Sequence, residues 1–108
     1  MTNGCFIDEY GNKRWYQNYK RHRDNDEPAV ILSNGAKKWY QNGLLHRDND
    51  EPAIICSNGD KFWFQNDKQH RDNGAAIEYF DGTKRWCIVG KEYSEEEYWR
   101  RIKLLVFR

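Results

Sequence analysis

The chain contains a 24-residue sequence repeat. Residues 11–34 read GNKRWYQNYKRHRDNDEPAVILSN and residues 35–58 read GAKKWYQNGLLHRDNDEPAIICSN, so the two copies agree at 17 of 24 positions. A third copy is one residue shorter, and a fourth is incomplete. A fixed period of this length is typical of a supersecondary unit that stacks on its own copies. We therefore expect a single repeat domain with these segments: an N-terminal half unit (1–10), three repeats (11–34, 35–58, 59–81), a partial repeat (82–93) and a terminal segment (94–108).

Composition limits the fold and the partners. The 16% aromatic content argues against disorder, although 32% of the residues are charged. A balance of 18 basic and 17 acidic residues provides no overall field to recruit long nucleic acid or an anionic membrane. The chain shows neither a secretory signal nor a run of about 20 apolar residues that would cross a bilayer. Its three cysteines occupy different positions of the repeat and favour reduced thiols, so we expect a cytoplasmic protein.

Turn-forming dipeptides divide each unit into strands. Asn34-Gly35 predicts a two-residue type I′ hairpin, in which both central residues have positive φ, and this turn would place Trp39 opposite Val30. The same count applies to the other units, where it pairs Trp15 with Phe6, Trp63 with Ile54 and Trp86 with Ile77.

A second dipeptide, Asn42-Gly43, predicts another hairpin turn that places His46 opposite Trp39. The R-D-N-D-E-P segment then forms a connecting turn, with Pro28 and Pro52 outside the central ladder. These patterns predict a mostly β fold: an elongated single antiparallel sheet of repeated hairpins in sequence order, with the tryptophans in one column.

The terminal segment has the pattern of a capping α-helix. Ser94 and Glu97 form a capping box, and acidic residues precede basic ones as the helix dipole prefers. Tyr98, Ile102 and Leu105 would share the face that closes the open end of the array. A helix that binds a partner is the alternative interpretation.

The string WYQNGLLH at residues 39–46, preceded by Asn34-Gly35, resembles the MORN repeat family, whose unit is a β-hairpin. The longer pattern N-G-x-K-x-W-Y-x-N-G-x-x-H-R-D is similar to a MORN-like variety common in bacteriophages and giant viruses. Arrays of that variety often end in G-K-x-Y-S-E-E-E, as residues 90–97 do. The resemblance implies a phage-type accessory or anti-defence protein that binds and inhibits a host protein in the host cytoplasm.

The residues that suggest metal chemistry have structural explanations. Equivalent histidines should lie about two strand spacings of 4.7–4.9 Å apart, which is too far to share one metal ion. Pro28 and Pro52 take a position at which a calcium loop needs an oxygen ligand. We expect instead that arginine and aspartate of neighbouring units form ion pairs. No nucleophile and base form a catalytic constellation, so we expect no enzyme, no catalytic residue, no metal and no cofactor.

The candidate binding residues are of two kinds. Tyr16, Tyr40 and Phe64 alternate with the tryptophans and should lie on the opposite side of the sheet. Positions that differ between units should carry specificity, because scaffold residues are copied. The complete candidate set is Tyr16, Tyr40, Phe64, Tyr19, Arg21, Leu44, Leu45, Lys68, Gln69 and Arg71.

The sequence leaves three functions open. The first is a non-catalytic binding module with a host protein as its partner. The second is sequestration of a small nucleotide signal without hydrolysis, at a site near residues 73–75, where the third copy lacks D-E-P. The third is a purely structural interaction repeat. The sequence sets no oligomeric state.

Overall fold

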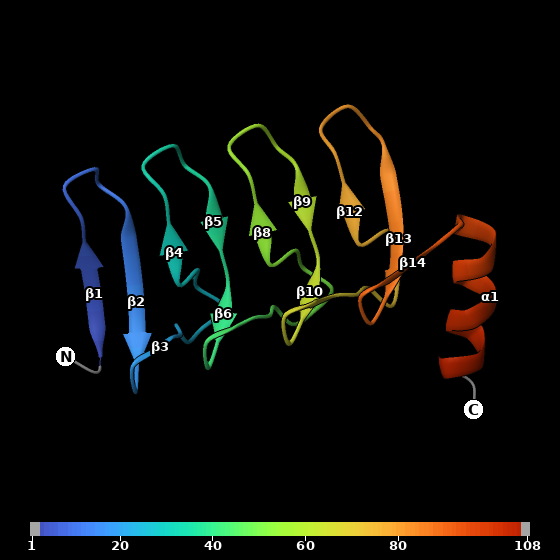
Figure 1. The fold of residues 1–108 in the computed structure, drawn as a ribbon, viewed down its shortest axis with the longest axis horizontal. Coiled ribbons are helices and arrows are strands. Elements are labelled where there is room, and N and C mark those ends of the chain that lie inside the picture. The colour runs from blue at the N-terminus through green and yellow to red at the C-terminus, as the bar shows by residue number, and fades with distance from the viewer. Residues whose placement is uncertain (1–2, 107–108) are drawn as a thin grey trace.

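A computed structural model describes residues 3–106 of the protein. Hairpins follow one another in chain order along a single layer of sheet, and one helix lies at the C-terminal end (Figure 1). The molecule measures 46 × 32 × 20 Å, so it is elongated and thin. The mostly β fold class, with an antiparallel sheet of repeated hairpins and a C-terminal helix, is confirmed.

The main sheet has ten strands in the order β1-β2-β4-β5-β8-β9-β12-β13-β14, with β3 paired to β2. The pairs β6-β7 and β10-β11 form two small ladders of their own. The elements are β1 (Gly4–Ile7), β2 (Lys13–Gln17), β3 (Lys20–Arg21), β4 (Val30–Ile31), β5 (Lys37–Lys38), β6 (Tyr40–Gln41), β7 (Leu44–Leu45), β8 (Ile54–Ile55), β9 (Lys61–Phe62), β10 (Phe64–Gln65), β11 (Lys68–Gln69), β12 (Ile77–Glu78), β13 (Lys84–Ile88), β14 (Lys91–Tyr93) and α1 (Glu95–Val106).

The predicted register of the first turn is wrong by one residue. Gly35 has a φ of +94°, but Asn34 does not have a positive φ, so the turn is not type I′. The Gly35 N–H donates to the Leu32 carbonyl at 2.9 Å, and the Leu32 N–H donates to the Ala36 carbonyl at 2.9 Å. These bonds enclose a three-residue connection, in which a type I turn is followed by a left-handed glycine. Val30 consequently lies opposite Lys38 rather than Trp39.

The same shift occurs in every unit. The pairs found are Phe6 with Arg14, Ile54 with Phe62 and Ile77 with Arg85. A one-residue shift moves a side chain to the other side of a sheet, so these apolar residues lie on the side opposite the tryptophans.

Alanine, rather than a large apolar residue, lies beside each of the three tryptophans of the full repeats. The backbone N–H groups of Trp15, Trp39 and Trp63 donate to the carbonyls of Ala29, Ala53 and Ala76 at 2.8, 2.7 and 2.8 Å. All three alanines are completely buried. The register places the tryptophans in one row, as predicted. The small alanine side chain between two indole rings leaves room for both rings.

The second turn has the predicted geometry. Asn42 and Gly43 both have positive φ, at 53° and 85°, and Tyr40 pairs with Leu45. The His46 N–H donates to the Trp39 carbonyl at 3.1 Å, which confirms the predicted opposition of these two residues. The corresponding turns at residues 18–19, 66–67 and 89–90 have positive φ at both positions.

The connecting segment is a turn, as predicted. Asn25 and Asp26 have φ values of 63° and 56°, and Asn49 and Asp50 repeat them at 65° and 58°. Such left-handed positions suit asparagine and aspartate. The prolines that follow are buried and lie outside the strands.

Helix α1 covers the C-terminal end of the array (Figure 1). The Glu97 N–H donates to Ser94 Oγ at 3.2 Å, which confirms Ser94 as the N-cap. Tyr98 and Ile102 are buried against Ile88, but Leu105 is 51% exposed, so its predicted place on the buried face is wrong. Of the terminal segment, residues 107–108 lie outside the described part of the chain, as do residues 1–2 at the other end.

Candidate functional site

The two sides of the sheet differ in chemistry. We call the side that carries Trp15, Trp39, Trp63 and Trp86 the tryptophan face, and the side that carries Tyr16, Tyr40 and Phe64 the tyrosine face. The register determines this division, because successive residues of a strand point to opposite sides.

On the tryptophan face, an arginine joins the second and the third unit to the unit before it. The Arg47 guanidinium carbon lies 3.7 Å from the centre of the Trp39 ring, which is cation–π geometry. Arg47 donates through Nε and Nη2 to the Asp26 carboxylate at 2.9 and 3.2 Å. Trp39 Nε1 donates to the backbone carbonyl of the same aspartate at 2.9 Å. Together they clasp the connecting turn of the preceding unit, which confirms the predicted ion pairing between units.

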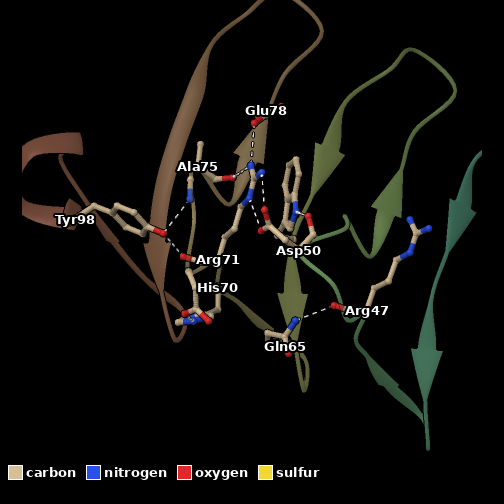
Figure 2. Close-up of polar contacts among 11 residues, drawn as sticks. Arg47, Asp50, Gln65, His70, Arg71, Ala75, Glu78 and Tyr98 are labelled. Carbon is tan, nitrogen blue, oxygen red and sulfur yellow. Dashed lines mark hydrogen bonds and ion pairs between the residues drawn. The ribbon is translucent and has the colours of Figure 1, made fainter. Parts of the chain in front are cut away.

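The next unit repeats this arrangement (Figure 2). Arg71 lies 3.9 Å from the Trp63 ring and donates to Asp50 at 2.9 and 3.3 Å. It makes a further ion pair with Glu78 at 2.9 Å. Partial burial disfavours the charged guanidinium, but the two carboxylates outweigh this and raise the pKa of Arg71. Its donors are therefore occupied within the array, although the sequence placed Arg71 among the binding residues.

The histidines also connect neighbouring units. Nε2 of His22, His46 and His70 lies 2.7, 2.8 and 2.6 Å from the aspartate two residues on. Nδ1 of each ring accepts a backbone N–H from the second turn of the next unit, at 3.0, 3.2 and 2.9 Å. Nδ1 thus acts as an acceptor and Nε2 as the donor. With both nitrogens engaged, the rings serve as connectors between units.

The irregular segment of the third repeat receives the cap. Gly74 stands where Asp26 and Asp50 stand in the earlier units, and its N–H donates to the Tyr98 hydroxyl at 3.2 Å. The same hydroxyl donates to the backbone carbonyl of Arg71 (Figure 2). Tyr98 is fully buried, and its ring centre lies 5.2 Å from that of Trp86. The segment that departs from the repeat is therefore the one whose backbone is bonded to a side chain of the helix.

A polar hollow of about 760 Å³ lies beside this segment. Its aspartates already have partners: Asp50 is bonded to Arg71, Asp72 to His70 and Asp48 to His46. Within residues 3–106, no group of three or more His, Cys, Asp or Glu side chains is placed to hold a metal ion.

Most of the predicted binding residues gather on the tyrosine face. The aromatic residues pair across the second turn with residues that differ between units: Tyr16 with Arg21, Tyr40 with Leu45 and Phe64 with Gln69. Arg21 also lies 5.5 Å from the Tyr40 ring of the next unit. Tyr19 lies in the second turn of its unit and is 76% exposed, and Leu44 begins β7 directly after the next such turn and is 39% exposed.

A groove of about 640 Å³ lies on the tyrosine face. Aliphatic and aromatic side chains and two lysines contribute to its lining. Its lining residues are Lys38, Ile54, Cys56, Phe62, Phe64, Asp67, Lys68, Gln69 and Gly90. Asp67 accepts the Leu45 N–H at 2.7 Å, whereas Lys38 and Lys68 have no ion pair within the described residues. Burial raises the pKa of the Cys56 thiol, so this groove does not favour a reactive thiolate.

Sequence reasoning missed two features of this site. Phe62 and Ile54 belong to the tyrosine face because of the three-residue turn, and only the correct register places them there. The role of Tyr98 was also missed. Its signal was the coincidence of a shortened repeat with an aromatic residue in the terminal helix.

Comparisons with family models, curated proteins and solved structures find no match to this chain, so the MORN-like resemblance stays an expectation. Across residues 3–106, no helix has the length and apolar character needed to cross a membrane.

Proposed function

We propose that the protein is a non-catalytic binding module that acts by stoichiometric binding of another protein through its tyrosine face. The supporting observation is the contrast between the two faces. On the tryptophan face, the Trp, His and Arg side chains recur in all three units, and those of the second and third units bond to neighbouring units. On the tyrosine face, the residue beside each aromatic ring changes from Arg21 to Leu45 to Gln69.

Physical chemistry favours a protein surface as the ligand of this face. A one-layer sheet has no second layer to cover its apolar side, so Phe6, Tyr40 and Phe62 stay only partly buried. Aromatic residues with arginine are typical of the centres of protein interfaces. The resemblance to phage repeats makes a host protein, such as a defence component in the host cytoplasm, the first partner to test.

The test uses the intact chain as bait in a bacterial lysate, followed by reconstitution with the purified partner. Leu45→Asp places a charge in the middle of the tyrosine face, and Lys37→Gln is the control on the tryptophan face. We expect the wild type and the control to retain one partner in a fixed ratio, as measured by analytical ultracentrifugation. Leu45→Asp should lose it while melting as a folded protein. Recovery of the same proteins by all three baits, or of none by the folded wild type, would contradict the proposal.

A second candidate is sequestration of a small nucleotide in the groove on the tyrosine face. Phe62 and Phe64 offer rings for base stacking, and Lys38 and Lys68 offer charges for phosphate. This location replaces residues 73–75, whose Gly74 N–H is bonded to Tyr98.

A thermal-shift screen of cyclic and linear nucleotides tests the second candidate. Ligand at a hundredfold excess over its dissociation constant stabilises a folded protein by about 2.7 kcal/mol. Stabilisation by a nucleotide that is recovered unaltered, and its loss in Lys68→Gln, is the expected result. A flat screen would remove this candidate.

A further inference from the structure

The second and third units each hold an aspartate between an arginine and a tryptophan, an arrangement that we call the clasp. The first unit has the same arginine and tryptophan, but no aspartate carboxylate binds to them within residues 3–106. The Arg23 guanidinium carbon lies 3.7 Å from the centre of the Trp15 ring, as Arg47 does over Trp39. Its Nη1 donates to the Pro28 carbonyl at 3.2 Å, as Arg47 Nη1 donates to Pro52 at 3.1 Å. The guanidinium is therefore held in the same pose before any ligand arrives.

The donors that bind aspartate in the later units have no such partner here. Nε and Nη2 of Arg23 make no hydrogen bond within residues 3–106, and Glu27 approaches only Nη1, at 4.0 Å. Trp15 Nε1 likewise has no acceptor among the described residues. Residue 2, which corresponds in the sequence to Asp26 and Asp50, is a threonine and carries no carboxylate.

The array itself shows what this clasp binds. Both filled copies receive an aspartate carboxylate on the arginine and the backbone carbonyl of the same aspartate on the indole N–H. The donors thus recognise an acidic turn, because a guanidinium fork pairs with a carboxylate in two parallel bonds.

A second copy of this chain is a poor source of that turn. Asp26 and Asp50 are already bound inside their own array. The corresponding position of the third repeat is Gly74, which has no carboxylate and is bonded to Tyr98 of the covering helix. The capped end therefore has no acidic turn to offer the open clasp of another molecule.

We infer that Trp15 and Arg23 form a docking site for an aspartate-containing acidic turn of a partner protein. This inference rests on the proposed function for the existence of a protein partner, and it adds the chemistry of one contact. The site lies on the tryptophan face, so it extends the interaction surface beyond the tyrosine face.

The probe is a synthetic peptide with the sequence of residues 44–54, LLHRDNDEPAI, titrated into the intact protein. Two-dimensional NMR follows the indole N–H of Trp15 and the Nε–H of Arg23. We expect saturable shifts of these two signals. Binding should weaken by about tenfold or more with the Asp50→Asn peptide or with the Arg23→Gln protein, because hydrogen bonds to charged groups contribute about 1.5–3 kcal/mol. Lys13→Gln, an exposed lysine on β2, is the charge-matched control and should bind like the wild type.

The outcomes separate this inference from the proposed function. Absence of shifts up to millimolar peptide, or equal affinity of wild type and Arg23→Gln, would overturn the docking site. If Arg23→Gln also retains the protein partner captured by the wild type, the proposed function stands without this contact. Peptide binding at Trp15 without capture of any partner would support the site and count against the proposed function.

Discussion

Replacing Tyr98 by phenylalanine removes one oxygen atom at the junction between the cap and the array. The hydroxyl accepts the Gly74 N–H at 3.2 Å and donates to the Arg71 carbonyl, and Tyr98 is fully buried. An unpaired buried polar group costs about 1–3 kcal/mol. Because the ring stays in place, we expect Tyr98→Phe to lower the free energy of unfolding by about 2 kcal/mol. For a chain of this size that corresponds to roughly 10 °C in the melting temperature.

Alkaline titration gives the same variant a second readout. Burial raises the pKa of Tyr98 above that of a free phenol, at about 10. The neutral form is favoured in the folded state, so this contribution to stability is complete below pH 10. It is lost as the pH rises through the raised pKa. The wild type should therefore lose stability above pH 10 more steeply than Tyr98→Phe.

Urea unfolding followed by tryptophan fluorescence measures both effects. Tyr19→Phe is the matched control, because Tyr19 is 76% exposed and its change should be within about 0.5 kcal/mol. If Tyr98→Phe unfolds at the same urea concentration as the wild type, the hydroxyl does not fasten the cap and the explanation of the shortened repeat is wrong.

Three further substitutions test the contacts between units and the first turn. Trp39→Ala removes a 6% exposed side chain and should cost about 3–5 kcal/mol; a melting curve like that of the wild type would contradict its place in the core. Arg47→Gln should cost about 1 kcal/mol more than Arg23→Gln in chemical unfolding, because Arg47 has a bidentate aspartate partner and Arg23 has none within residues 3–106; equal costs would show that this ion pair adds nothing. Desolvation raises the pKa of Asp8, but hydrogen bonds, led by that from the Asn12 side chain, lower it to about 2. This stability is present above pH 4 and is lost as the pH falls towards 2, so acid titration of Asp8→Asn should show a shallower loss than the wild type.

Local signals in the sequence predicted several parts of the molecule correctly. Asn42-Gly43 determined the second turn, because two adjacent positive φ angles are accessible to this pair at low cost. Ser94 marked the start of the helix through its side-chain bond to Glu97. The pairing of arginine with aspartate followed from their repetition at a fixed spacing. Each of these features depends on residues close in the chain or on the repeat itself.

The first turn could not be settled in the same way. Asn34-Gly35 is compatible with two-residue and three-residue connections, since glycine has a positive φ in both. The choice depends on the neighbouring units: Trp39 needs a small residue beside it, and the register found places buried Ala53 there. A one-residue error was enough to move Ile54 and Phe62 from one face of the sheet to the other.

The sequence by itself determined that the protein is an array, because a period of fixed length forces equivalent residues into equivalent places. It also determined which positions are copied and which vary. Only the tertiary structure decided what those positions do, since the role of a side chain depends on the unit beside it. Arg47 is bound to Asp26 of its neighbour, whereas Arg23, with the same local sequence, has no carboxylate at that place. Hydrogen bonds and packing act over a few ångströms, and these contacts join residues about twenty positions apart.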